Sequence, residues 1–357
     1  MRQTPLRILI IKPSSLGDIV HTFPAAALIH ATIPDVRLDW VANDALAQMV
    51  ELFPHLHRVI HFPRQHLSLF KPGFIRQFLH ELRRDEYDAA IDFQGLLRSG
   101  LMAGFTRTPL RFGFGHSREG ARYFYTTRVD CPPEISHAAE KNLYLARSAM
   151  ESMGFNPPAA MPEARLAIPA AWDNAADELL ERLGIPANAP LLAVGCSSRW
   201  ESKSWPTEFF AKTLRLVAEK RPRMTMWLLG GAGERSRAED VVSQAALPRL
   251  HNLAGLTDLG TLTALLARST ALLTNDSGPM HIAAALGTPC VACFGATSAE
   301  LTGPYGPPGR HRIIQSKCPQ APCFRRICPR LPGEGPCPQG ITPGEAADAI
   351  LERVASE

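Results

Sequence analysis

The stretch "RILIIKPSSLGDIVHTFPA", residues 7–25, carries the local pattern from which the fold of this 357-residue chain is built. An apolar run over 7–12 predicts a buried strand, a small polar loop follows, and helical spacing begins at about residue 18. A strand that leads directly into a helix is the unit of parallel sheets. Asp18 stands at the start of this helix, where an acid either caps the helix or lies at the mouth of an active site.

The same alternation of strand and helix recurs in both halves of the chain. Further strand-like segments followed by helical spacing lie at 37–42, 57–62, 87–93, 191–196, 224–231 and 271–276. A Pro- and Ala-rich stretch over 155–171 predicts a linker between the halves. We therefore expect an α/β protein of two doubly wound domains, 1–160 and 161–340, followed by a helix in 341–357. A ligand is expected in the cleft between the domains, at the carboxyl ends of the strands.

The composition is that of an ordinary soluble globular protein, with 45% hydrophobic and 20% charged residues. The net charge of +4 permits an anionic substrate or membrane surface, and it is too small to indicate a nucleic-acid partner. No run of about 18 apolar residues predicts a transmembrane helix. The first apolar segment is too short for a signal peptide. We expect a cytoplasmic protein.

The stretch "TNDSGPMH", residues 274–281, places a helix start directly after a buried strand. Free backbone N–H groups and the positive end of the helix dipole suit a diphosphate there, and Gly278 allows close approach. Ser277 and His281 can face the same anion. The alternative is an ordinary helix start at which Asp276 or Ser277 is the N-cap.

The loop "CSSRWESKSWP", residues 196–206, follows the strand at 191–196. The hydroxyls of Ser197 and Ser198, with Arg199 and Lys203, suit phosphate oxygens, although the local pattern alone favours a solvated polar loop. The pattern of a Walker loop is absent.

The stretch "GGAGERS", residues 230–236, resembles a dinucleotide fingerprint but has Ser236 where the last glycine is required, which argues against a dehydrogenase. Glu234 stands at a helix start, where it either accepts hydrogen bonds from ribose hydroxyls or only stabilises the helix dipole.

Two further segments carry unusual side chains. Residues 58–128 are basic, and Arg64, Lys71, Arg98, Arg118 and Arg122 can face an anionic acceptor, although most such charges only face solvent. Near the C-terminus the cysteines lack the C-x2-C pairs of structural zinc, so free thiols or a redox-sensitive loop are favoured while metal binding stays open. These cysteines are Cys318, Cys323, Cys328 and Cys337.

Several motifs together resemble the lipopolysaccharide heptosyltransferases, glycosyltransferase family 9, and most of all the type I branch. They are "ILIIKPSSLGDIVHTFPA", "LDWVAND", "YDAAIDFQGLLRSG", "SKSWP", "TNDSGPMHIAAALGTP" and "FGATSAELTGPYG". The resemblance implies a GT-B architecture of two facing Rossmann-like domains, with the acceptor on the first and the nucleotide-sugar on the second. It implies inverting transfer from ADP-heptose to a Kdo-containing inner-core acceptor on lipid A, without cofactor or catalytic metal. Peripheral contact with the inner face of the inner membrane would follow.

The resemblance also implies roles for individual residues. Asp18 matches the general base, Lys203 the cation that neutralises the diphosphate, and Glu234 the ribose-binding acid. The implied donor-binding residues are Ser197, Ser198, Arg199, Lys203, Glu234, Leu256, Asp276, Ser277, Gly278 and His281. The expected acceptor-binding residues are Ser15, Gly17, Arg64, Gln94, Arg98 and Arg118. The chain departs from the family pattern at Pro279 and in the Cys-rich segment 318–337.

Three other functions remain as alternatives. A type II enzyme would transfer heptose to an already heptosylated core, and a GT-B nucleotide-sugar epimerase would turn over the donor without an acceptor. A sugar-nucleotide-binding protein with a spent active site would bind ADP without transfer, but the presence of both Asp18 and Lys203 argues against it.

Overall fold

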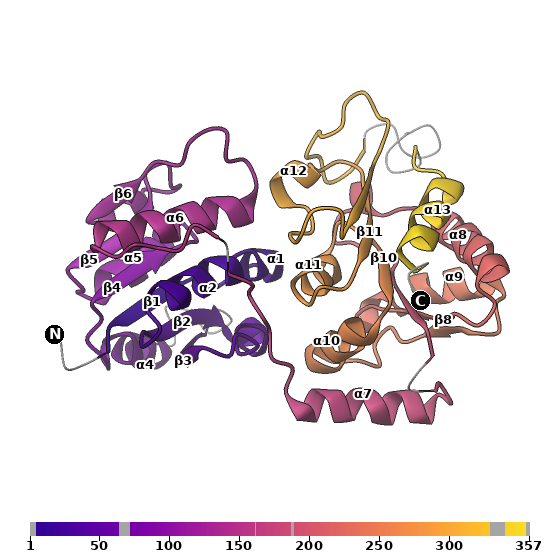
Figure 1. The fold of residues 1–357 in the computed structure, drawn as a ribbon, viewed down its shortest axis with the longest axis horizontal. Coiled ribbons are helices and arrows are strands. Elements are labelled where there is room, and N and C mark those ends of the chain that lie inside the picture. The colour runs from indigo at the N-terminus through magenta and orange to yellow at the C-terminus, as the bar shows by residue number, and fades with distance from the viewer. Residues whose placement is uncertain (1–4, 64–71, 161, 187–188, 329–339, 355–357) are drawn as a thin grey trace. The chain divides into compact units, whose positions relative to one another are not determined.

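The computed structural model describes residues 5–354 except 64–71, 161, 187–188 and 329–339. The chain divides into two compact units, Met1–Ala167 and Ile168–Glu357 (Figure 1). This division lies a few residues beyond the boundary predicted at 160. Each unit is described by itself.

The first unit is built on a six-stranded sheet with the order β3-β2-β1-β4-β5-β6, in which every pairing is parallel. Its strands are β1 Arg7–Ile11, β2 Arg37–Asn43, β3 Leu56–Phe62, β4 Ala89–Asp92, β5 Leu110–Phe114 and β6 Thr127–Val129. Its helices are α1 Leu16–Val20, α2 Phe23–Thr32, η1 Asp44–Leu46, α3 Ala47–Val50, α4 Pro72–Arg83, α5 Leu97–Phe105, η3 Ala121–Phe124 and α6 Ala138–Ser152.

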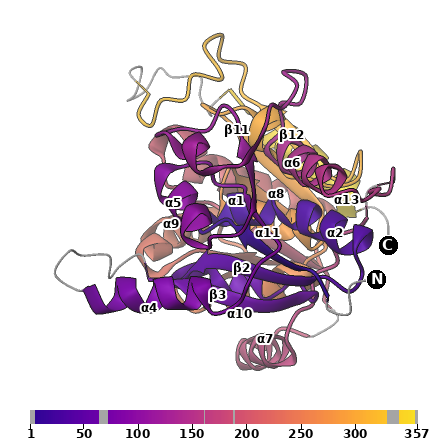
Figure 2. The same cartoon turned by 90° about the vertical axis from the view of Figure 1, so that its left-hand side faces the viewer.

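The core of the first unit follows from its sequence pattern. A parallel sheet is covered on both faces, so its central strands are continuous apolar runs rather than alternating ones, and Ile8–Ile11 of β1 are fully buried. On one face, Leu9 and Ile11 share a cluster with Phe78 and Leu82 of α4. The alanines of α2 allow close approach of α6, and the two helices lie side by side (Figure 2).

The second unit repeats this topology. Its all-parallel sheet has the order β12-β11-β10-β7-β8-β9, which is the order of the first sheet when the strands are counted along each unit. The strands are β7 Leu191–Gly195, β8 Thr225–Leu228, β9 Leu250–Asn252, β10 Ala271–Asn275, β11 Cys290–Phe294 and β12 Arg312–Gln315. The helices are α7 Ala170–Arg182, η4 Glu201–Lys203, α8 Thr207–Lys220, η5 Ala232–Glu234, α9 Arg235–Ala245, α10 Leu259–Arg268, α11 Gly278–Ala285, α12 Ala299–Thr302 and α13 Pro343–Val354.

Both sheets have a topological switch point, where the strand order reverses. It lies between β1 and β4 in the first unit and between β7 and β10 in the second. The loops after neighbouring strands diverge there, which opens a crevice in which doubly wound proteins bind their ligands. The expected α/β class with parallel sheets is thus confirmed, and each unit has one predicted ligand position.

The C-terminal helix α13 belongs to the second unit. Ile341 and Ile350 are fully buried in the same cluster as Leu214 of α8. Among the helices of the described ranges, none is long and apolar enough to cross a membrane.

His311, at the edge of the second sheet, makes the stability of this unit depend on pH. The backbone N–H of Cys290 donates to Nδ1 of His311 at 3.3 Å. Burial, together with the charges of Arg310 and Arg353, lowers the pKa of His311 from about 6.5 to about 4. Between these values the unfolded chain binds a proton that the folded ring does not, so stability is lost as the pH falls through this window.

We expect His311→Gln to reduce this acid sensitivity, because the amide oxygen still accepts from Cys290 but does not titrate. Between about pH 7.5 and pH 5 the variant should lose about 2 kcal/mol less unfolding free energy than the wild type, measured by urea denaturation. The control is His80→Gln, at a side chain that is 78% exposed. Equal pH dependence of His311→Gln and wild type would contradict the prediction.

Candidate active site

In the first unit, Lys12 and Asp18 lie in the loop and helix that follow β1. The side chain of Lys12 is buried, donates from Nζ to the carbonyl oxygen of Phe93 at 2.7 Å, and lies 3.9 Å from Oδ1 of Asp18. Phe93 follows β4, so this lysine joins the loops on the two sides of the switch point. A buried ammonium group requires such partners.

Asp18 is not the N-cap of its helix, which corrects one of the two alternatives. Helix α1 begins at Leu16 and Ser15 is its N-cap, so Asp18 is the third helical residue. Its Oδ2 accepts hydrogen bonds from the backbone N–H of Ser15 at 2.8 Å and from the Ser15 hydroxyl at 2.7 Å. The side chain remains 42% exposed. The carboxylate is therefore held in place from one side and accessible from the other.

The charge of Asp18 is stabilised by its neighbours. Burial acts to raise the pKa of Asp18, but Lys12 and the two hydrogen bonds from Ser15 outweigh it, and the pKa lies below its ordinary value. Burial likewise lowers the pKa of Lys12, and the carboxylates of Asp18 and Asp92 oppose that shift. Asp18 is thus an unprotonated carboxylate at neutral pH, which a general base requires.

On the other side of the switch point, Asp92 organises the loop that carries Gln94. Its carboxylate is fully buried and accepts from the backbone N–H groups of Gln94 at 2.8 Å and Gly95 at 3.1 Å, and from the Tyr125 hydroxyl at 2.7 Å. Burial raises the pKa of Asp92 against these hydrogen bonds. Oε1 of Gln94 then accepts from the backbone N–H of Ser14 at 3.3 Å.

The expected acceptor residues are only partly brought together. Ser15 donates to Asp18 directly, Gly17 precedes Asp18 in α1, and Gln94 accepts from the backbone of Ser14 in the same loop. Arg118 lies next to the Gln94 loop, because its backbone N–H donates to the carbonyl of Gly95 at 2.9 Å. Arg98 instead places its guanidinium over the ring of Phe62, 5.7 Å from the centroid, and Arg122 lies 5.1 Å from the Tyr123 ring. Arg64 and Lys71 lie outside the described residues.

In the second unit, Lys203 forms an ion pair across the switch point. Its Nζ lies 2.6 Å from Oδ2 of Asp276, and the hydroxyl of Thr297 donates to the same oxygen at 2.6 Å. Asp276 is 6% exposed and Lys203 is 17% exposed at the side chain. Lys203 comes from the loop after β7, Asp276 follows β10 and Thr297 follows β11. Three loops therefore meet on one carboxylate.

The helix that follows β10 begins at Gly278, with Ser277 as its N-cap by position. Asp276 is therefore not the cap. The Ser277 hydroxyl lies 3.0 Å from Oγ1 of Thr274, and Pro279 occupies the first turn, where its missing N–H costs no hydrogen bond. His281 is buried one turn into the helix. Asp276 lies two residues before the first residue of α11 and pairs with Lys203, so the start of α11 lies close to Lys203.

The loop after β7 is fastened from several sides. The Ser198 hydroxyl donates to the carbonyl of Asp276 at 3.2 Å. Arg237 of α9 donates to the carbonyls of Cys196 at 2.9 Å and Trp205 at 2.6 Å, one on each side of the loop. Ser197 adjoins Cys196 at the end of β7, and Arg199 is exposed. The loop is therefore not the freely solvated segment of the alternative interpretation.

Glu234 and Leu256 lie at neighbouring turns after β8 and β9. Oε2 of Glu234 accepts from the backbone N–H of Gly231 at 2.7 Å, at the start of α9. The backbone N–H of Gly255 donates to the carbonyl of Gly230 at 2.9 Å, which brings Leu256 beside this turn. Leu256 is 41% exposed. An acid next to an exposed apolar side chain is an arrangement suited to a nucleoside.

The described cysteines are free thiols. Cys318, Cys323 and Cys328 are half-buried, and Cys337 lies outside the described residues. Within the ranges that the structure describes, no three His, Cys, Asp or Glu side chains are grouped as a metal site would require. The buried thiols of Cys290 and Cys293 have raised pKa values because they are desolvated. Such thiols are poor nucleophiles.

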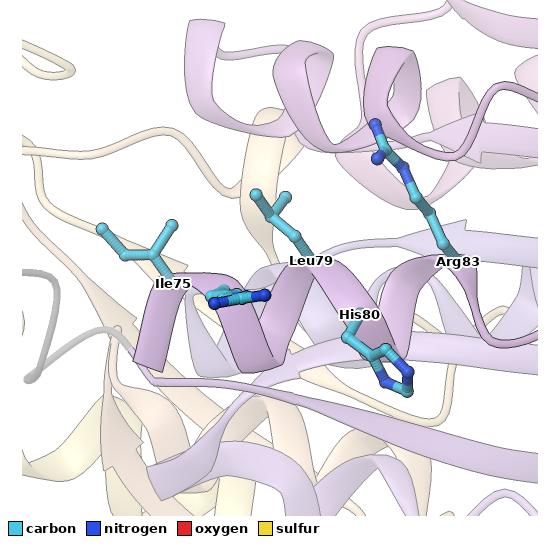
Figure 3. Close-up of a pocket in the computed structure, with 5 residues that line it drawn as sticks. Ile75, Leu79, His80 and Arg83 are labelled. Carbon is cyan, nitrogen blue, oxygen red and sulfur yellow. The ribbon is translucent and has the colours of Figure 1, made fainter. Parts of the chain in front are cut away.

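A hollow of about 460 Å³ lies elsewhere, along α4 (Figure 3). It is lined by Ile75, Arg76, Leu79, His80 and Arg83, all from one helix. None of the predicted donor or acceptor residues contributes to it.

Four important side chains were not among the predicted site residues. Lys12 ends the apolar run of β1 and Asp92 ends β4, and a charged residue at the end of a buried strand was a usable signal. Thr297 and Arg237 carry no such signal, because their partners Asp276, Cys196 and Trp205 lie in loops far away along the chain.

Both units have the Rossmann strand order. A carboxylate lies at the switch point of the first unit, and a lysine lies beside a helix start at that of the second. Together these features define a nucleotide-sugar transferase of the GT-B class. The sequence model of "Glycosyltransferase family 9 (heptosyltransferase)" matches residues 75–332. The chain belongs to this family, and the resemblance seen in its motifs is confirmed.

Relatives and solved structures agree with this membership. Lipopolysaccharide heptosyltransferase 1 of Pseudomonas aeruginosa is 30% identical, over 92% of this chain and 89% of the relative. The protein of the same name from Escherichia coli K12 is 26% identical, over 84% and 91%. The structure of E. coli heptosyltransferase WaaC with ADP superposes with a TM-score of 0.78 at 24% identity, covering 98% of this chain and all of that one. A family 9 structure from Veillonella parvula reaches 0.83 at 21% identity, covering 100% and 99%.

Proposed function

We propose that this protein transfers heptose from ADP-heptose to a Kdo-containing inner-core acceptor of lipopolysaccharide, with inversion at the anomeric carbon. The observation that carries the proposal is the 30% identity to a type I lipopolysaccharide heptosyltransferase over 92% of the chain. The accessible carboxylate of Asp18 and the Lys203–Asp276 pair supply the two kinds of group that such a transfer needs.

In the proposed mechanism, Asp18 removes the proton from the acceptor hydroxyl as that oxygen attacks the anomeric carbon. The bond from this carbon to the diphosphate breaks, and ADP leaves with the electron pair. Lys203 and the N–H groups at the start of α11 stabilise the charge that develops on the diphosphate. Glu234 holds the ribose, Leu256 lies against the adenine, and the hydroxyls of the β7 loop contact the phosphates. Gln94, Ser15 and Arg118 bind the acceptor.

A transfer assay with purified full-length protein tests the proposal. ADP-heptose should donate to Kdo-lipid A and not to a core that already carries the first heptose. Transfer to the heptosylated core alone would make this a type II enzyme instead. Release of ADP or isomerisation of the donor without any acceptor would support the epimerase alternative and contradict the proposal.

We also propose that the protein works in the cytoplasm, in peripheral contact with the inner face of the inner membrane, because its proposed acceptor is lipid-borne. The support is a surface of α4 and α5. Figure 3 shows Ile75, Leu79 and Arg83 extending to the same side of α4. On α5, exposed apolar side chains recur at helical spacing at Leu97, Leu101 and Phe105. Arg76, Arg84 and Arg107 are exposed nearby and can meet lipid phosphates.

We expect the protein to sediment with vesicles that contain phosphatidylglycerol, and to be released as the salt concentration rises, because screened arginines lose their attraction to the surface. Leu97→Gln combined with Leu101→Gln should weaken binding about tenfold. The matched control is Leu216→Gln, at a leucine of α8 that is 38% exposed. Vesicle binding that is changed neither by salt nor by the two leucine substitutions in α5 would contradict the proposed contact.

A further inference from the structure

The Cys-rich segment that departs from the family pattern brings a second cation to Lys203. The backbone N–H of Ser202 donates to the carbonyl of Arg326 at 3.2 Å, and the Ser202 hydroxyl donates to the carbonyl of Arg325 at 2.5 Å. The backbone N–H of Phe324 donates to the carbonyl of Ala296 at 2.8 Å. Residues 324–326 are thus attached to the loop after β7 and to the loop after β11.

These are two of the loops that meet on Asp276. Lys203 directly follows Ser202, and Thr297 directly follows Ala296, and both contact the carboxylate of Asp276. Segment 324–326 therefore lies over the carboxyl end of the sheet, where the donor diphosphate is proposed to bind. No other part of the described chain joins these two loops through backbone hydrogen bonds from a single segment.

Trp200 brings the two cations to one aromatic ring. Nζ of Lys203 lies 4.6 Å from the centroid of the Trp200 ring, and Cζ of Arg326 lies 5.5 Å from it. Two like charges on one ring repel each other, and Asp276 compensates only Lys203 by direct contact. Along the chain, Arg199 adjoins Trp200 and Arg325 adjoins Arg326, so these two segments carry more cations than carboxylates. A dianionic group bound beside the ring would remove the repulsion.

We infer that Arg326 is a donor-binding residue whose guanidinium contacts the diphosphate of the nucleotide-sugar together with Lys203. This inference rests on the proposed donor, ADP-heptose. The planar guanidinium donates two parallel hydrogen bonds to phosphate oxygens, which the ammonium of Lys203 cannot do. Trp200 orients both cations, and the backbone hydrogen bonds of residues 324–326 hold Arg326 in place.

Calorimetric titration of the full-length protein with ADP and with AMP tests the inference without any transfer reaction. Arg326→Gln should weaken ADP binding about tenfold and leave AMP binding within about twofold, because AMP lacks the second phosphate. Arg326→Lys should keep part of the ADP affinity. Arg325→Gln is the matched control, since Arg325 is bound to the β7 loop through its backbone carbonyl, and should bind ADP as the wild type does.

The outcomes separate the inference from the proposed function. If Arg326→Gln binds ADP like the wild type, or loses ADP and AMP affinity equally, Arg326 is only a surface cation stacked on Trp200 and the inference is wrong. An equal loss in Arg325→Gln also overturns it. If wild-type protein binds ADP and shows the Arg326 effect but transfers no heptose, the proposed function fails and the inference stands. Wild-type protein that does not bind ADP refutes both.

Discussion

Asp18→Asn should lower the rate of heptose transfer about 10³-fold while the protein stays folded, because a carboxamide cannot accept the proton of the acceptor hydroxyl. The change is nearly isosteric, and the asparagine oxygen can still accept the 2.8 Å hydrogen bond from the backbone of Ser15. The measurement is kcat with saturating ADP-heptose and Kdo-lipid A, beside a thermal unfolding curve. The control is Asp35→Asn, the same change at an exposed aspartate outside the site, which should transfer heptose at the wild-type rate.

The pH profile provides a second readout of the same carboxylate. Lys12 and Ser15 hold the pKa of Asp18 below its ordinary value against the effect of burial. The basic form therefore persists as the pH falls, and the acid limb of kcat/KM should lie below the ordinary pKa of an aspartate side chain. Lys12→Met removes the nearest cation and should move this limb to higher pH. Near-normal transfer by folded Asp18→Asn, or an acid limb that Lys12→Met does not move, would show that another group is the base.

Lys203→Met should lower kcat/KM for ADP-heptose about 10²- to 10³-fold, because the departing diphosphate loses its nearest cation. The loss should appear in ADP affinity as well, since ADP carries the same diphosphate. Methionine keeps most of the apolar stem that lies beside Trp200. Steady-state kinetics and calorimetry with ADP measure the two effects.

The control for Lys203 is Lys212→Met in α8, a lysine that also lies over an aromatic ring, 5.7 Å from the centroid of Phe209. Because Asp276 is 6% exposed and loses its ion pair in Lys203→Met, the second unit should also become less stable, and Lys203→Met with Asp276→Asn should recover stability without recovering transfer. If the double variant recovers both, Lys203 acts only through the fold.

Much of the fold was predictable because its signals are local. The apolar runs at 7–12 and 271–276 are continuous, as parallel strands buried on both faces require, and each leads within a few residues into helical spacing. Both strands and both following helices are present in the structure. The start of α1 was less predictable, since Ser15 rather than Asp18 precedes its first helical turn. At α11, Ser277, one of the two expected N-caps, does precede the first turn.

The candidate site was predictable as a set of loops but not as a set of contacts. A strand followed by a polar loop identifies a residue at the carboxyl edge of a sheet, and this reasoning singled out Asp18 and Lys203 from local pattern. Which loops become neighbours depends on strand order. That order follows from how crossover helices pack on the sheet, which no short-range periodicity records.

The sequence by itself therefore determined the two α/β halves, their family and the loops that carry the chemistry. Only the tertiary structure decided that Lys12 holds Asp18, that Thr297 and Lys203 share Asp276, and that Arg326 shares Trp200 with Lys203. The physical reason is that helical and strand periodicity arise from neighbouring residues, whereas charges and hydrogen bonds act over a few ångströms in space, between segments that only the folded sheet brings together.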